Sequence, residues 1–135
     1  MEHERDSRAY VPEESRRARM VPVYAVLRTL SRKELQALVE RCCQHARRFA
    51  RGLADVDYEL LNEVVLNQVL VSGGDAEVTR RVIAGVQAEG TCWCGGTECH
   101  GRAAIRMSVS SWATTAGTVE QRLGAITRVV GRIVS

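Results

Sequence analysis

At 135 residues, with 45% hydrophobic and 26% charged side chains, the chain suits one globular domain that buries its core without disulfides or metal. A net charge of +3 and an aromatic content of 4% argue against nucleic-acid binding, which needs basic surface and stacking platforms. No apolar run reaches the ~20 residues of a membrane helix, and the N-terminus lacks a secretory signal, so we expect a cytoplasmic protein whose cysteines are thiols.

The N-terminal part of the chain is predicted to be helical after a charged lead-in. Residues 1–12 lack periodicity and are expected to form a loose lead-in. Residues 13–54 are expected to be a helical segment that links to a further domain. Between Glu13 and Leu30 apolar residues recur at steps of three and four, and Pro22 suggests a kink or a restart.

The clearest predicted element is a long helix that starts at Ser31. Ser31 is a plausible N-cap, and Glu34 lies three residues later, where it completes a capping box. Gly52 and Asp55 mark the end of the helix. One apolar stripe runs along it, formed by Leu35, Leu38, Val39, Cys42, Ala46, Phe49, Ala50 and Leu53. This pattern predicts a helix that packs on a sheet or on another helix.

Residues 55–135 are predicted to form a small α+β domain. A helix is expected between Asp75, as N-cap, and Gly90, and a last helix starts near Thr118, with Gln121 three positions on. The predicted strands are Tyr58–Leu61, Val64–Val71, Thr91–Cys94 and Ala103–Ser110. Short strands joined by turns and helices predict a small, mostly antiparallel sheet with helices on one face, preceded by the long helix.

A cluster of metal-binding residue types lies at 92–100. Cys92, Cys94, Cys99 and His100 form the pattern Cys-x-Cys-x4-Cys-His, which differs from the paired spacing of structural zinc sites. On an extended backbone Cys92 and Cys94 share one face, whereas Cys99 and His100 point to opposite faces. A small zinc- or redox-responsive Cys/His module is therefore one interpretation. The other is that the first two cysteines are buried hydrophobes and the last two lie in an exposed turn.

The strand at 103–110 has one apolar and one polar face. The apolar face consists of Ile105, Met107 and Val109. The polar face carries Arg106 between two hydroxyl-bearing residues, Ser108 and Ser110. A guanidinium offers a planar pair of donors that suits a carboxylate. Spacing alone leaves open whether this face is simply solvated or belongs to a binding site.

These residues resemble a known family. The stretch GTCWCGGTECHGRAAIRMSVSSWATT, followed by VEQRLGAI, is similar to the C-terminal end of the group II pyridoxal-phosphate-dependent amino acid decarboxylases, which have the aspartate aminotransferase fold (fold type I). Upstream, PEESRRARMVPVYAVLRTLSR resembles the helix leading out of the large domain. LVERCCQHARRFARGL resembles the connecting helix, and ELLNEVVLNQVLV resembles the first strands of the small domain. The resemblance is specific over residues 90–126 and looser elsewhere.

The resemblance implies a substrate-binding role for Arg106. In related fold type I enzymes an arginine on the matching strand binds a carboxylate of the amino-acid substrate, with Ser108 and Ser110 beside it here. Cys94, Cys99 and His100 depart from the family pattern, so they are not expected to carry family chemistry. The resemblance thus implies a carboxy-lyase domain that contributes substrate-binding residues.

The same resemblance implies parts that these 135 residues do not contain. The family's aldimine lysine and pyridoxal phosphate site belong to the large domain, and the single lysine here, Lys33, has a different context. We therefore expect a truncated or split decarboxylase domain that, alone, neither holds the cofactor nor catalyses decarboxylation. Its expected partner is a separate large-domain chain or, through the N-terminal helices, a second copy of itself.

Overall fold

A computed structural model describes residue 18 and residues 20–134, so the predicted lead-in, 1–12, and the beginning of the predicted helical segment lie outside the described residues. Contacts divide the chain into two units, residues 1–36 and 37–135, with the division inside the second helix. In the part of the chain that the structure describes, no helix has the length and apolarity to cross a membrane. The elements are α1 Met20–Thr29, α2 Arg32–Ala54, β1 Glu59–Leu60, β2 Gln68–Ser72, α3 Ala76–Glu89, β3 Gly95–Cys99, β4 Arg102–Ser108 and α4 Ala116–Val134.

The first unit holds α1 and the beginning of α2. Pro22 lies in the first turn of α1, where a missing backbone N–H costs no helical hydrogen bond, so it marks a start and does not kink the helix. The predicted capping box is confirmed, since Ser31 Oγ accepts from the Glu34 N–H at 3.2 Å and Glu34 Oε2 accepts from the Ser31 N–H at 2.7 Å. These hydrogen bonds to Ser31 lower the pKa of Glu34.

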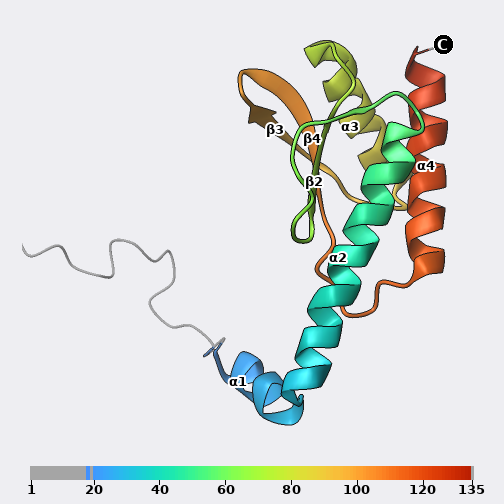
Figure 1. Cartoon of the computed structure of the whole chain (residues 1–135). Helices are drawn as coiled ribbons and strands as arrows, with labels where there is room; N and C mark the ends of the chain where they lie inside the picture. Colours follow the sequence, from blue (N-terminus) through green and yellow to red (C-terminus); the bar gives the residue numbers. More distant parts are fainter. Residues whose placement is uncertain (1–17, 19, 135) are drawn as a thin grey trace, which may run out of the picture. The chain divides into compact units, whose positions relative to one another are not determined.

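The second unit is an α+β domain built on a four-stranded antiparallel sheet. The strand order is β1-β2-β4-β3, so the predicted fold class is confirmed. Figure 1 shows α3 and α4, with the later part of α2, on one side of this sheet. The sheet residues that face these helices include Val69, Val71, Ile105 and Met107, which are all buried. The helices contribute Ala46, Phe49, Leu53, Val82, Val86, Val119, Leu123, Ile126 and Val129 to the same core.

The strand boundaries differ most from the sequence prediction at the start of β2 and at β3. β2 begins at Gln68, because the side chain of Asn62 closes the preceding segment into a loop: Asn62 Oδ1 accepts from the Leu70 N–H at 2.8 Å and Nδ2 donates to Gln68 O at 3.2 Å. Thr91–Cys94 is not a strand; β3 follows it. His100 and Gly101, between β3 and β4, both have positive φ and form a two-residue turn typical of tight hairpins. This turn fixes the pairing of β3 with β4.

The N-cap of the last helix lies three residues before the predicted one, Thr118. Thr115 Oγ1 accepts from the Thr118 N–H at 3.2 Å, and Thr118 Oγ1 accepts from the Thr115 N–H at 3.0 Å. Thr115 is therefore the N-cap, and Thr118 takes the place that Glu or Gln has in a standard capping box. The predicted role of Gln121 as that partner is wrong.

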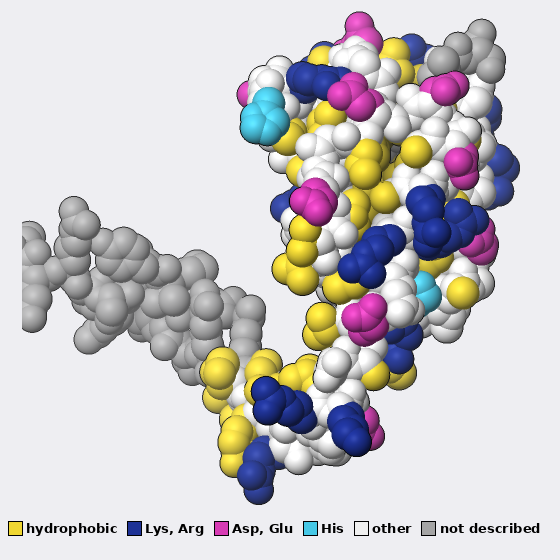
Figure 2. Space-filling view, in the orientation of Figure 1, with side chains coloured by type: hydrophobic (Ala, Val, Ile, Leu, Met, Phe, Trp, Pro, Cys, Tyr) yellow, Lys and Arg dark blue, Asp and Glu magenta, His cyan; other side chains and the backbone are white. Residues whose placement is uncertain are grey.

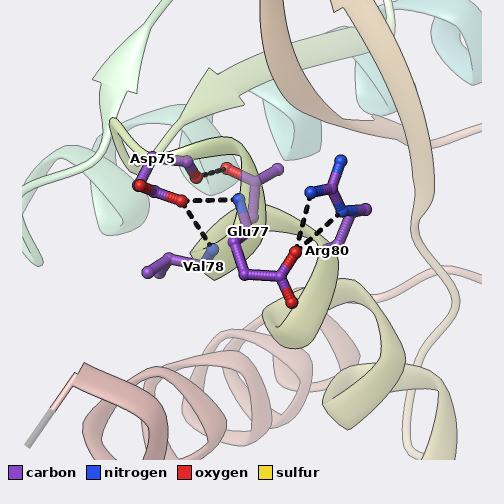
Figure 3. Close-up of polar contacts among 5 residues, drawn as sticks. Asp75, Glu77, Val78 and Arg80 are labelled. Carbon is purple, nitrogen blue, oxygen red and sulfur yellow. Dashed lines mark hydrogen bonds and ion pairs between the residues drawn. The ribbon is translucent and has the colours of Figure 1, made fainter.

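The predicted ends of α3 are confirmed. Asp75 accepts hydrogen bonds from the backbone N–H groups of Glu77 and Val78 (Figure 3), and Gly90 ends the helix with φ 82°. The close-up also shows the ion pair between Glu77 and Arg80, at 2.7 Å, one turn into the helix. The two caps, Asp75 and Gly90, follow from local sequence, which explains why they were predictable.

We expect Asp75→Ala to lower the free energy of unfolding by about 1 kcal/mol, within the range of about 0.5–2 kcal/mol for loss of an N-cap. Urea denaturation followed by circular dichroism measures the change. Asp75→Asn is the matched control, because asparagine caps as well as aspartate and should leave stability nearly unchanged. Equal losses in the two variants would show that the charge matters and the cap does not.

Candidate functional site

Arg106 lies near the middle of β4, on the face of the sheet opposite the helices. Its neighbours across the sheet are Leu70 on β2 and Gly95 on β3. The flanking residues Ile105 and Met107 are buried in the core, whereas Arg106 is exposed. The alternation predicted for this strand therefore holds, and it places the guanidinium on the face that the helices leave open.

The surroundings of Arg106 leave its charge available. A Cβ built on its neighbour Gly95 would meet no atom within 4 Å, so the space on that side is open. Ser108 is exposed on the same face and pairs with Gln68, and Ser110 is exposed beyond the end of β4. Within the described residues, no hydrogen bond or ion pair engages the Arg106 side chain. The structure thus brings Arg106 and Ser108 together on one face, with Ser110 just past the strand.

A second arginine of β4, Arg102, lies on the same face as Arg106, and its charge is neutralised by a carboxylate. Arg102 donates two hydrogen bonds to the carboxylate of Glu59, from Nη1 at 2.8 Å and from Nη2 at 2.6 Å. This side-chain hydrogen bonding lowers the pKa of Glu59 and raises that of Arg102. Arg102 and Arg106 therefore form a matched pair on one strand, the first with a carboxylate partner and the second with none among the described residues.

The pKa of Glu59 should rise to its ordinary value in an Arg102→Gln variant. Because folding lowers this pKa, the carboxylate contributes stability above its unfolded pKa, and that contribution is lost as the pH falls through its folded pKa. Side-chain carbon NMR across an acidic pH series measures the titration in both proteins. Identical Glu59 titration curves would contradict the ion pair, and Arg106→Gln, which has no carboxylate partner to release, serves as control.

The cysteines predicted as an alternative metal site are dispersed. Cys94 is 2% exposed and belongs to the core, whereas Cys99 faces the open side with its pairing partner Arg102. His100 is exposed in the β3–β4 turn, and Cys92 is half-buried. Among the described residues, no three His, Cys, Asp or Glu side chains are grouped so that they could hold a metal ion.

Burial also sets the thiol chemistry. It raises the pKa of Cys94 to about 11, with the nearby Cys92 thiol adding to the effect, and it raises the pKa of Cys92 as well. Metal ligation and nucleophilic attack both need the thiolate, so these shifts oppose either role at neutral pH. All five cysteines are free thiols. The geometry gives no support to a zinc- or redox-responsive module.

Comparison with known proteins finds similar structures, but no match by sequence to a family model or to a curated protein. Among solved structures, similar ones are Catharanthus roseus tryptophan decarboxylase in complex with L-tryptophan (18% identity, TM-score 0.75, 85% of this chain and 26% of that chain) and Rhodiola rosea 4-hydroxyphenylacetaldehyde synthase (24%, 0.76, 90% and 28%). A third is the glutamate decarboxylase domain of a diaminobutyrate-pyruvate transaminase and L-2,4-diaminobutyrate decarboxylase from Vibrio parahaemolyticus (19%, 0.68, 82% and 25%).

The fold is therefore that of a part of these proteins, and the resemblance inferred from the sequence is confirmed at the level of the fold. The chain spans about a quarter of the length of these structures. The small α+β unit accounts for most of the matched region, because residues 37–135 make up most of the chain.

Sequence reasoning missed one feature of chemical interest. Arg122 on α4 is half-buried, its Nε atom is fully buried, and within the described residues Nε has no hydrogen-bond partner. The sequence has 18 arginines, and Arg122 is one of several that flank an apolar stripe of a helix. No local signal distinguishes it, because its burial depends on a strand and a loop that are distant along the chain.

Proposed function

We propose that this chain is the small C-terminal domain of a pyridoxal-phosphate-dependent amino acid decarboxylase, a carboxy-lyase. In this proposal Arg106 binds the carboxylate of the amino-acid substrate. The likeness of fold over 82–90% of the chain supports the first statement. The observation that carries the second is the exposed guanidinium of Arg106, which has no partner among the described residues while Arg102 on the same strand is paired.

Arg106 has the chemistry for this role. A guanidinium donates two parallel hydrogen bonds to a carboxylate, and its charge persists at every physiological pH. The hydroxyls of Ser108 and Ser110 can donate further hydrogen bonds to the same ligand. An exposed arginine alone binds a carboxylate weakly, because water competes for both groups. The proposal therefore requires that another domain cover this face and exclude water when substrate binds.

The cofactor does not fit the residues of this chain. Pyridoxal phosphate would supply the electron sink for the bond that breaks when CO2 leaves. Lys33, the single lysine, is exposed in the first turn of α2, which is not an enclosed site that keeps water from the cofactor. We propose that a large domain outside these 135 residues holds the cofactor, and that the chain alone does not release CO2.

The exposed apolar side chains of α1 support the proposal that this chain binds a partner. Figure 2 shows hydrophobic side chains at the surface of this helix, and a contiguous apolar surface on a soluble protein commonly marks an interaction site. The exposed apolar residues are Met20, Val21, Val23, Tyr24, Val26 and Leu27. We propose that the large domain covers them. A second copy of this chain is the alternative occupant, which sedimentation of the purified chain would reveal as a dimer.

The test uses an affinity-tagged full chain expressed in its own host. We expect it to co-purify with a chain that carries bound pyridoxal phosphate, and the complex to release CO2 from an amino acid. The purified chain incubated with pyridoxal phosphate should show no Schiff-base absorbance and no CO2 release. Schiff-base absorbance that disappears in Lys33→Ala would contradict the assignment of the cofactor to another domain. A complex that carries the cofactor but releases no CO2 from any amino acid would contradict the carboxy-lyase assignment.

A further inference from the structure

A small cavity lies on the helix side of the sheet, apart from Arg106. Its volume is about 40 Å³, and it is lined by residues of the end of β4, of α2 and α4, and of the segment that precedes β3. The residues with polar side chains that line it from the helix side are Arg122 and Cys92, and Trp93 borders it. Phe49 and Ile126 form much of its apolar wall. A charged group therefore lines a small, largely apolar space.

Arg122 differs from Arg128 on the same helix in having no counter-ion among the described residues. Arg128 pairs with Glu89 at 3.2 Å, and Glu120, two residues before Arg122, pairs with Arg48 at 2.7 Å. Arg122 is half-buried with its Nε fully buried, and within the described residues no hydrogen bond or ion pair engages it. A buried N–H donor without an acceptor is unfavourable, so the Nε of this guanidinium is expected to bind an acceptor such as an anion.

We propose that Arg122 binds a single carboxylate group in this cavity, next to the thiol of Cys92. The size limits the ligand: a cavity of about 40 Å³ admits a small group such as a carboxylate and has no room for a whole amino acid or nucleotide. Carboxylate geometry matches the paired donors of a guanidinium. The carboxylate comes either from a small organic acid or from an acidic side chain of a polypeptide, and the rest of that ligand lies outside.

The position of Cys92 permits a direct test by alkylation. Iodoacetate carries the proposed carboxylate, whereas iodoacetamide is its neutral analogue. In both reactions the thiolate sulfur forms a bond to the CH2 carbon, iodide leaves, and the thiol proton goes to the buffer. If Arg122 binds the carboxylate, Cys92 should prefer iodoacetate over iodoacetamide relative to Cys99, by about tenfold or more, which is the size of a hydrogen bond to a charged group.

Cys99 is the matched control within the same protein. It is also half-buried and faces an arginine, but that arginine, Arg102, is already paired with Glu59. Mass spectrometry of peptides gives both rates from one sample of the full chain at mildly alkaline pH. Arg122→Gln should remove the preference at Cys92, Arg122→Lys should retain part of it, and Arg102→Gln should leave it intact. Equal preference at the two cysteines of the unaltered protein, or a preference that survives Arg122→Gln, would overturn the proposal.

Two competitors distinguish the source of the carboxylate. Protection of Cys92 from iodoacetate by acetate would assign the site to small organic acids. Protection by an amidated peptide with one internal glutamate, without protection by acetate, would assign it to a polypeptide side chain. Failure of both to protect at saturating concentration would contradict a carboxylate site. None of these results depends on decarboxylase activity, so the test stands apart from the function proposed above.

Discussion

Leu53→Ala should lower the free energy of unfolding by about 2–5 kcal/mol, the range for removing a large buried aliphatic side chain. Leu53 is 1% exposed and lies in the last turn of α2, where it belongs to the core cluster. At the adjacent position, a Cβ built on Gly52 would lie 2.8 Å from Leu123 of α4. The two helices are thus close here, and little rearrangement is available to fill the space that alanine would leave.

Denaturant unfolding of the two proteins measures this loss. Leu66→Ala removes the same atoms from a side chain that is 63% exposed, and it should change stability by less than about 0.5 kcal/mol. Similar small losses at the two positions would contradict the packing of α2 on the sheet and α4. That packing covers one face of the sheet. Such a result would therefore also contradict the assignment of Arg106 to the uncovered face.

Arg106→Gln in the cofactor-bearing complex should lower kcat/KM for the amino acid by about 10- to 100-fold. This range corresponds to loss of hydrogen bonds between charged groups, which contribute about 1.5–3 kcal/mol in protected sites. Steady-state release of CO2 gives both kinetic constants. If the arginine binds the carboxylate equally in the ground state and the transition state, the loss appears in KM and kcat stays constant.

Arg102→Gln is the control for this measurement. It removes the same charge from the same strand and face, but at a position where Glu59 already neutralises it. We expect its kcat/KM to stay within about twofold of the unaltered complex, since exposed ion pairs contribute little. Equal losses in the two variants would indicate a general effect of surface charge and would remove the special role of Arg106.

Local sequence signals predicted the capping box of α2 and both caps of α3, because such signals act over three or four residues, whereas the cap of α4 was placed wrongly. Ser31 with Glu34, Asp75, and Gly90 each interact within their own turn of the chain. The strands were predicted with less accuracy. The start of β2 depends on the side-chain hydrogen bonds of Asn62, and β3 depends on a hairpin turn that places it four residues later than expected.

The candidate site was predictable only in part. The alternation around Arg106 indicates which face it takes, and the resemblance to decarboxylases suggests a role for that face. Pairing across long sequence distances is not visible in the pattern: Arg102 meets Glu59, 43 residues away, and Arg122 acquires its burial from segments far along the chain. Which arginines are neutralised, and which are free to bind a ligand, therefore emerges only from the folded structure.

The most direct test compares an amino acid with the amine that remains after its carboxylate is lost. In the cofactor-bearing complex, Arg106→Gln should weaken binding of the amino acid by about tenfold or more and leave binding of the amine unchanged, because only the first ligand carries the group that Arg106 is proposed to bind. Spectroscopic titration of the cofactor with each ligand gives both affinities. Equal weakening for the two ligands, or none for either, would contradict the account.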